Sequence, residues 1–284
     1  MNYLAYVSTL KSHNVKKIVL LFLVTSLMLA AVKSAFAQQT STNWAGYTIT
    51  SNDVTGISAS WTVPAVQCTV TGATNQWTQG LSVWIGLDGW NNNGIPEQIG
   101  TDSDCYNGSP TYSAWEEDPT LSTSLIAFGD TEAGDHVTAS IAYLGSNQFQ
   151  LSIKDITQGE SRTYTVIIRG ALRSSAEWIL EAWYNINTGK QATLPSFQPI
   201  IFNDCSASVN NTAGSISQLK GEPLNMVDKN NNTVVTAQGL NQAGTSFSVA
   251  EVSPAPEFPN AVLVLATLFT VLVILRKQIA HSAL

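Results

Sequence analysis

Short runs of β-branched and aromatic residues, separated by clusters of Gly, Asn, Asp and Ser, fill the chain between residues 38 and 252. Such runs, with turn residues at regular intervals, are typical of a β-sandwich or barrel. The clearest are GISASWTV (56–63), LSVWIGL (81–87), DHVTASIAYL (135–144), QFQLSIKDI (148–156), SRTYTVIIRG (161–170), AEWILEAW (176–183), QPIIFNDCSASV (198–209) and TSFSVAEV (245–252). The pattern predicts one all-β, two-sheet antiparallel domain over 38–252, whose polar stretch 229–244 forms loops and edge strands.

The N-terminal segment has a different pattern. Lys11, Lys16 and Lys17 precede an uncharged apolar block over 18–32, and small residues follow at Ala35 and Ala37. This order is that of a secretory signal peptide, so we expect residues 1–37 to be removed and the domain to be exported. A retained N-terminal anchor is the alternative.

The C-terminal segment 253–284 predicts a membrane anchor or a sorting tail. Residues 259–275 carry no charge and would span roughly 25 Å as a helix, slightly less than a ~30 Å hydrocarbon core. Arg276 and Lys277 follow this run and favour a cytoplasmic end, which places the domain outside the cell. The Pro256-Glu257-Phe258 triplet also resembles the Pro-Glu-Phe sorting signals of archaeal surface proteins, which are cut during processing. The expected location is therefore extracellular, at the cell surface.

The charge, cysteine and histidine content limits the possible partners and the possible kinds of active site. Seven Lys and Arg stand against twenty Asp and Glu between Ala37 and Arg276, a net charge of −13 that argues against a nucleic-acid partner. Cys68, Cys105 and Cys205 allow one disulfide and one free thiol, with the pairing left open. We expect no metal and no cofactor. Of the three histidines only His136 lies in the exported part, in a turn where a surface position is expected, so a histidine-dependent triad or zinc site is poorly supported.

Two glutamates lie four residues apart in the apolar run AEWILEAW. In a strand, Glu177, Ile179 and Glu181 face one side, and Trp178 and Leu180 face the other. A carboxyl group beside tryptophan is desolvated, which raises its pKa and suits a general base or acid. An ordinary solvated strand face is the alternative interpretation of this segment alone.

Six motifs in order decide between these interpretations. They are NWAGY (43–47), SWTVP (60–64), VWIGLDG (83–89), EQIGTD (97–102), YSAWEEDP (112–119) and AEWILEAW (176–183). Together they resemble the glutamic peptidases, also called eqolisins, over about residues 42–205. The resemblance implies a lectin-like (concanavalin A-like) sandwich with a cleft on a concave face, and an acid endopeptidase that acts on proteins or peptides, expected here as a monomer.

The resemblance also implies the site. Its catalytic glutamine falls on Gln98 and its catalytic glutamate on Glu181, which would activate a water molecule while the Gln98 amide donates to the oxyanion. Substrate-binding or tuning roles fall on Trp44, Trp84, Asp102, Glu117 and Trp183. Glu177 matches a glutamate that is expected to form hydrogen bonds.

Two departures from the family pattern concern the cleft. Ser113 replaces an aspartate of the Y-D-A-W motif, and WEEDP replaces an aromatic-rich flap, which changes the expected substrate preference and pH optimum. A surface lectin-like module that binds carbohydrate through GLDGWNNNG (86–94) is the alternative function. Such a module has no need of both Gln98 and Glu181.

Overall fold

The computed structural model describes residues 39–69, 77–92, 95–117, 125–185 and 189–252. The chain divides into two compact units, Met1–Gln39 and Thr40–Leu284, and the fold described here is that of the second. The expected signal peptide and the expected C-terminal anchor lie outside the described residues. Within the described ranges, no helix is long and apolar enough to span a membrane.

Regular structure in the described residues consists of β-strands and one short 3₁₀ helix, as the sequence predicts. The strands of the first half are β1 (Gln39–Ser41), β2 (Trp44–Thr50), β3 (Val54–Thr62), β4 (Val66–Gln67), β5 (Trp77–Gln79), β6 (Ser82–Leu87), β7 (Glu97–Tyr106), β8 (Ser109–Glu117), β9 (Leu125–Phe128) and β10 (His136–Gly145), with η1 at Trp90–Asn92. The others are β11 (Gln148–Asp155), β12 (Ser161–Ile167), β13 (Ser175–Glu181), β14 (Tyr184–Asn185), β15 (Lys190–Gln191), β16 (Ser196–Phe197), β17 (Ile200–Val209), β18 (Thr212–Ser215), β19 (Glu222–Val227), β20 (Thr233–Ala237) and β21 (Phe247–Glu251).

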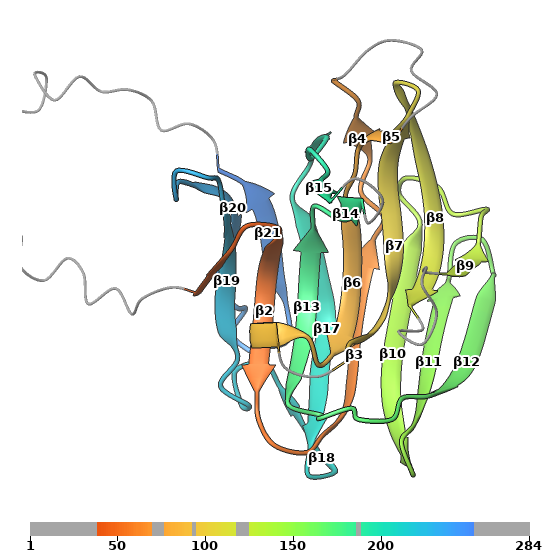
Figure 1. Ribbon diagram of the computed structural model, residues 1–284. Helices are drawn as coiled ribbons and strands as arrows, with labels where there is room; N and C mark the ends of the chain where they lie inside the picture. The colour runs from red at the N-terminus through yellow and green to blue at the C-terminus, as the bar shows by residue number, and fades with distance from the viewer. Residues whose placement is uncertain (1–38, 70–76, 93–94, 118–124, 186–188, 253–284) are drawn as a thin grey trace, which may run out of the picture. The chain divides into compact units, whose positions relative to one another are not determined.

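The strands form two antiparallel layers (Figure 1). Sheet A has the order β21-β20-β19-β2-β13-β6-β7-β8-β9. Sheet B has the order β18-β17-β3-β10-β11-β12. Strand β17 joins the layers, because its first residues pair with β21 and the remainder pair with β3.

The main core lies between the two sheets. The indole N–H of Trp178 in sheet A donates to the Ser58 carbonyl oxygen in sheet B at 3.0 Å. The indole N–H of Trp61 in sheet B donates in turn to the Thr101 hydroxyl in sheet A at 2.9 Å. These bonds let large aromatic side chains fill the interior without leaving a buried N–H unpaired. The predicted alternation along β13 is thereby confirmed, since Trp178 and Leu180 belong to this core and Ile179 does not.

One segment differs from its sequence interpretation. The polar stretch 229–244 contains β20, which pairs with β19 on one side and β21 on the other and is therefore not an edge strand. Its alternate residues Val235 and Ala237 are buried, which a composition dominated by Asn and Thr conceals.

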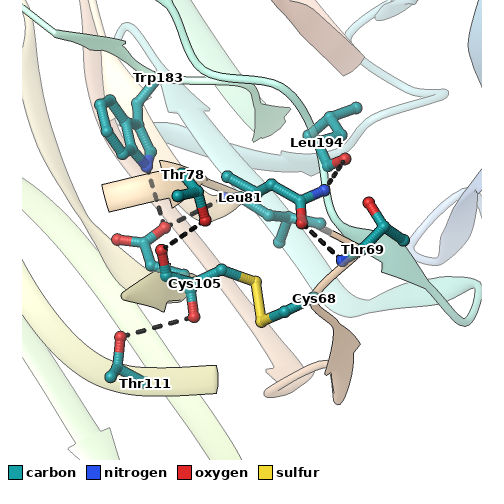
Figure 2. The surroundings of a disulfide bond; sticks show 10 residues. Cys68, Thr69, Thr78, Leu81, Cys105, Thr111, Trp183 and Leu194 are labelled. Atoms are coloured by element: carbon teal, nitrogen blue, oxygen red, sulfur yellow. Dashed lines mark hydrogen bonds between the residues drawn. A yellow bond between two sulfur atoms is a disulfide. The ribbon is translucent and has the colours of Figure 1, made fainter. Parts of the chain in front are cut away.

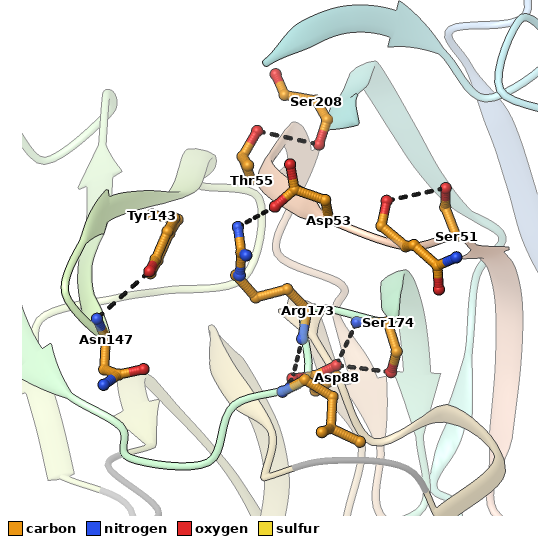
Figure 3. A network of polar contacts seen from close by, with 11 residues as sticks. Ser51, Asp53, Thr55, Asp88, Tyr143, Asn147, Arg173, Ser174 and Ser208 are labelled. Atoms are coloured by element: carbon orange, nitrogen blue, oxygen red, sulfur yellow. Dashed lines mark hydrogen bonds and ion pairs between the residues drawn. The ribbon is translucent and has the colours of Figure 1, made fainter. Parts of the chain in front are cut away.

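A polar network holds the chain where β6 and β13 meet their loops (Figure 3). The Asp88 carboxylate accepts the backbone N–H groups of Leu172, Arg173 and Ser174 at 2.7–2.8 Å, and also the Ser174 hydroxyl. The Arg173 guanidinium pairs with Asp53 and lies 4.2 Å from the centre of the Tyr143 ring. These contacts fix the entry into β13, the strand that carries Glu177 and Glu181.

The disulfide joins Cys68 to Cys105 (Figure 2). The sequence alone left open which two of the three cysteines are paired. Cys205 is a buried free thiol, and burial raises its pKa. The expected count of one disulfide and one free thiol is therefore confirmed. His136 is exposed, as expected.

Candidate active site

The register of sheet A assigns the candidate residues to one face. Directly paired residues of an antiparallel sheet project to the same side, and every second residue along a strand does the same. One row across the sheet is Trp44, Glu181, Ser82 and Asp102, and a parallel row two positions farther along the strands is Gly46, Ile179, Trp84, Gly100 and Trp115. A third row is Thr48, Glu177, Gly86, Gln98 and Glu117. This side, turned away from sheet B, is called the outer face below.

Glu181 ends β13 on the outer face and is only partly exposed. Its carboxylate accepts two hydrogen bonds from separate strands and loops: the Asn43 amide donates to Oε1 at 3.0 Å, and the Trp84 indole donates to Oε2 at 2.9 Å. Asn43 is itself held, because its side-chain oxygen accepts the Ser41 hydroxyl at 3.0 Å. The carboxylate is therefore fixed in orientation before any substrate arrives.

The pKa of Glu181 is raised to about 7, mainly by burial, and the nearby charge of Glu117 acts in the same direction. The side chains of Trp44, Trp84 and Asn43 act in the opposite direction, because they favour the ionised form. Desolvation outweighs these donors. A carboxyl group with such a pKa changes its charge in the weakly acidic to neutral range, where it can both take and return a proton.

Trp84 lies between Glu181 and Gln98. Its side chain is fully buried, and its N–H edge is bonded to Glu181. The opposite ring edge lies over Gly86, where a Cβ atom would come within 2.7 Å of Trp84 Cζ3 and 3.2 Å of Gln98 Cγ. The ring of Trp44 meets Trp84 edge to face, with ring centroids 4.9 Å apart. The indole thus reaches from its hydrogen bond with Glu181 to the space at Gly86, which Gln98 also adjoins.

Gln98 lies on β7, two strands away from β13, and its side chain is 6% exposed. It pairs with Gly86 on one side and with Glu117 on the other. Burial raises the pKa of Glu117. Gln98 and Glu181 therefore share one face of one sheet, and Glu117 beside Gln98 is near enough for its charge to affect Glu181.

Asp102 and Asp104 occupy the far end of the same strand. The Ser82 hydroxyl donates to Asp102, whose pKa burial raises to about 6. Asp104 accepts the backbone N–H of Leu81 at 3.2 Å and the indole N–H of Trp183 at 2.9 Å (Figure 2). Trp183 thus contacts the neighbourhood of the disulfide through Asp104, whereas Trp44 and Trp84 adjoin Glu181.

Glu177 is fully buried, and neither carboxyl oxygen has a hydrogen bond of normal geometry within the described part of the chain. Burial raises its pKa well above the usual range. The Ser175 hydroxyl and the Trp90 backbone N–H lie close enough to act against the rise of its pKa.

The model of the Peptidase A4 family matches residues 42–250. The chain belongs to this family, the glutamic peptidases. The family is one of hydrolases, so the protein is an enzyme of that class. The matched residues include all six sequence motifs and both candidate catalytic side chains.

Known members of the family share the fold. Aspergillopepsin-2 of Aspergillus niger is 27% identical over 164 residues, which are 51% of this chain and 57% of that protein. The crystal structure of scytalido-glutamic peptidase with a transition state analog inhibitor is 22% identical, with a TM-score of 0.63 over 74% of this chain and 98% of that one. Aspergilloglutamic peptidase from Aspergillus niger is 21% identical, with a TM-score of 0.52 over 61% and 99% of the two chains.

Two residues of this site had no role in the sequence interpretation. Asn43 stands beside Trp44 in the first motif, and Gly86 stands two residues after Trp84 in the third. Adjacency to a motif tryptophan was the available signal. The sequence does not show that Asn43 contacts Glu181 or that Gly86 lies beside Gln98, because these contacts depend on how distant strands pair.

Proposed function

We propose that the protein is an endopeptidase that acts on the acid side of neutrality, with Glu181 as base and acid and Gln98 as oxyanion donor. The observation that carries the proposal is the Glu181 carboxyl group, held by Asn43 and Trp84, on the same sheet face as Gln98. The donors orient it, and burial gives it a pKa of about 7.

The proposed reaction needs no metal or cofactor. Ionised Glu181 takes a proton from water, and the water oxygen attacks the peptide carbonyl carbon. The side-chain amide of Gln98 donates to the negative oxygen that forms, and it can do so at any working pH because an amide does not titrate. Glu181 then gives the proton to the leaving nitrogen as the C–N bond breaks, which restores the carboxylate.

The supporting residues have distinct proposed roles. Trp44 and Trp84 would line the cleft beside Glu181, while Asp102 and Glu117 would tune its charge. The pKa of Asp102 is raised to about 6 and that of Glu117 is raised, both by burial, so these carboxyl groups lose their charge as the pH falls. Trp183 would bind substrate only at the end near Asp104.

The test is hydrolysis of a denatured protein by the purified enzyme from pH 2 to 8. We expect internal cleavage with a weakly acidic optimum, because each pH unit below the Glu181 pKa reduces the ionised base about tenfold. Absence of cleavage at every pH, together with binding to glycans, would replace the proposal by the lectin-like alternative.

Gln98→Ala tests the oxyanion role. Loss of one donor to a developing oxyanion costs ~10²–10³ in rate, so kcat should fall by that factor while the protein stays folded. Steady-state kinetics at the optimal pH would measure it. Gln238→Ala, at an exposed position directly after β20, is the matched control and should keep the wild-type kcat. A Gln98→Ala variant with the wild-type kcat would remove Gln98 from the mechanism.

We also propose that the domain is exported and held at the cell surface by the segment 253–284. The disulfide supports an oxidising compartment. The order of charged and apolar residues at both ends of the sequence supports the orientation. Protease added to intact cells should digest the domain and spare a cytoplasmic marker. Protection of the domain in intact cells, and its digestion only after lysis, would contradict this orientation.

A further inference from the structure

Trp84 lies over two glycines of the outer face. Gly86 follows it by two residues on β6, and Gly100 is its direct partner on β7. A Cβ atom at Gly100 would lie 2.5 Å from Trp84 Cβ and 2.4 Å from the Val83 carbonyl oxygen. A Cβ atom at Gly86 would lie 2.7 Å from Trp84 Cζ3. The missing side chain at Gly100 thus lets β7 approach the backbone and Cβ of Trp84, and the missing side chain at Gly86 leaves a slot that the far edge of the indole occupies.

The slot fixes the ring from several sides. Trp44 contacts it edge to face at 4.9 Å, and Ile179 of the adjacent strand belongs to the same small apolar cluster. Its N–H edge is bonded to Glu181 at 2.9 Å. An indole is rigid, so a displacement at Cζ3 must tilt or shift the Nε1 edge as well. Gly86, at the Gln98 end, is therefore coupled to the hydrogen bond at the Glu181 end.

We propose that Gly86 is a positioning residue of the active site: its missing side chain lets the Trp84 indole extend from Gln98 to Glu181 and hold both in place. The inference rests on the proposed function of that pair. Carbon atoms that are not bonded to one another prefer separations of about 3.5–4.0 Å. A methyl group at Gly86 would therefore push the ring edge by about 1 Å, and it would also press on Gln98 Cγ.

Gly86→Ala in the full chain is the test, with Gly239→Ala as the matched control. Gly239 is exposed, and a Cβ atom there would have no atom within 4 Å. A misplacement of about 1 Å can cost ~10²-fold in rate, so kcat should fall ~10–100-fold in Gly86→Ala, with a much smaller change in KM. The control should keep wild-type kinetics. Equal kinetics of the two variants, with an active wild type, would overturn the inference and leave the proposed function intact.

A double-mutant cycle separates positioning from a general loss of packing. Trp84→Phe removes the ring edge that meets Gly86, which leaves room for a methyl group. Gly86→Ala should then cost less than ~3-fold when added to Trp84→Phe, in contrast to its effect in the wild type. Additive effects would show that Gly86 does not act through Trp84. In the double variant the smaller ring leaves room for the methyl group. Comparison of the double variant with Trp84→Phe therefore still tests the coupling if Gly86→Ala alone folds poorly.

A spectroscopic measurement does not depend on catalysis. The ¹H–¹⁵N indole signal of Trp84 should titrate with Glu181 in the wild type, because the two are hydrogen-bonded. Gly86→Ala should shrink this titration, and Gly239→Ala should preserve it. An unchanged titration in Gly86→Ala would reject the coupling. If the wild type cleaves no substrate but this difference is seen, the proposed function fails while the structural coupling stands.

Discussion

Replacing Glu181 by Gln should abolish most peptide hydrolysis and leave the fold intact. The amide keeps the shape of the carboxyl group, and its oxygen can still accept a hydrogen bond from Asn43 or Trp84. It cannot take a proton from water. General-base assistance is worth ~10²–10⁴-fold, and a group that also returns the proton should reach the upper end of that range. The measurement is kcat at the optimal pH, beside thermal unfolding of the same sample.

Glu177→Gln is the matched control for this prediction. Glu177 lies on the same strand and face, two outer-face positions from Glu181. Its pKa is raised well above the usual range by burial, so it is protonated at acidic pH, and glutamine closely resembles that neutral form. Activity should therefore stay within a few-fold of the wild type. The assignment of Glu181 as the catalytic base would be wrong if folded Glu181→Gln kept near-normal proteolysis. It would also be wrong if Glu177→Gln lost more activity than Glu181→Gln.

The folded domain should be much more stable at pH 4.5 than at pH 8.5. The pKa of Glu97 is raised from 4.5 to about 9, mainly by burial and also by the charge of Asp88. Burial also raises the pKa of Glu181 to about 7 and, in direction, those of Glu177 and Asp104. Between pH 4.5 and 9 the folded state therefore binds protons that the unfolded state has lost. Stability is fully present below the unfolded pKa values and is lost as the pH rises through the folded ones.

The size of this effect is several kcal/mol. Each unit of pKa shift is worth about 1.4 kcal/mol, so Glu97 alone has an upper limit of roughly 6 kcal/mol between its ordinary and its folded pKa. Its side chain is fully buried, and neither carboxyl oxygen has a hydrogen-bond partner in the described part of the chain. Its own backbone N–H acts to favour the charged form, and burial outweighs it.

Urea unfolding at pH 4.5 and 8.5, followed by tryptophan fluorescence, measures the difference. Glu97→Gln should raise the stability at pH 8.5 and change it little at pH 4.5, because an amide cannot ionise. Asp130→Asn, at an exposed position, should change neither value appreciably. A wild-type domain that is equally stable at both pH values would show that these carboxyl groups ionise without cost in the folded state.

Strand content and the faces of β13 followed from the sequence. Alternation in AEWILEAW correctly assigned Trp178 and Leu180 to the core side and Glu181 to the other side. The six ordered motifs likewise predicted the family, which the match over residues 42–250 confirms. Both inferences succeed because alternation and short motifs are local properties of the chain, so no distant contact is needed to recognise them.

Tertiary structure alone decided which partners each side chain meets. Asn43, which directly precedes β2, and Trp84 reach Glu181 only because β2 and β6 flank β13. A one-residue slip of β6 would send the Trp84 side chain to the core. The disulfide partner of Cys68 and the burial of Glu177 likewise depend on how distant segments pack together. The sequence by itself determined the strands, their faces and the family. Packing determined the pKa of Glu181 and the slot for Trp84, because desolvation and contact arise only when distant strands are brought together.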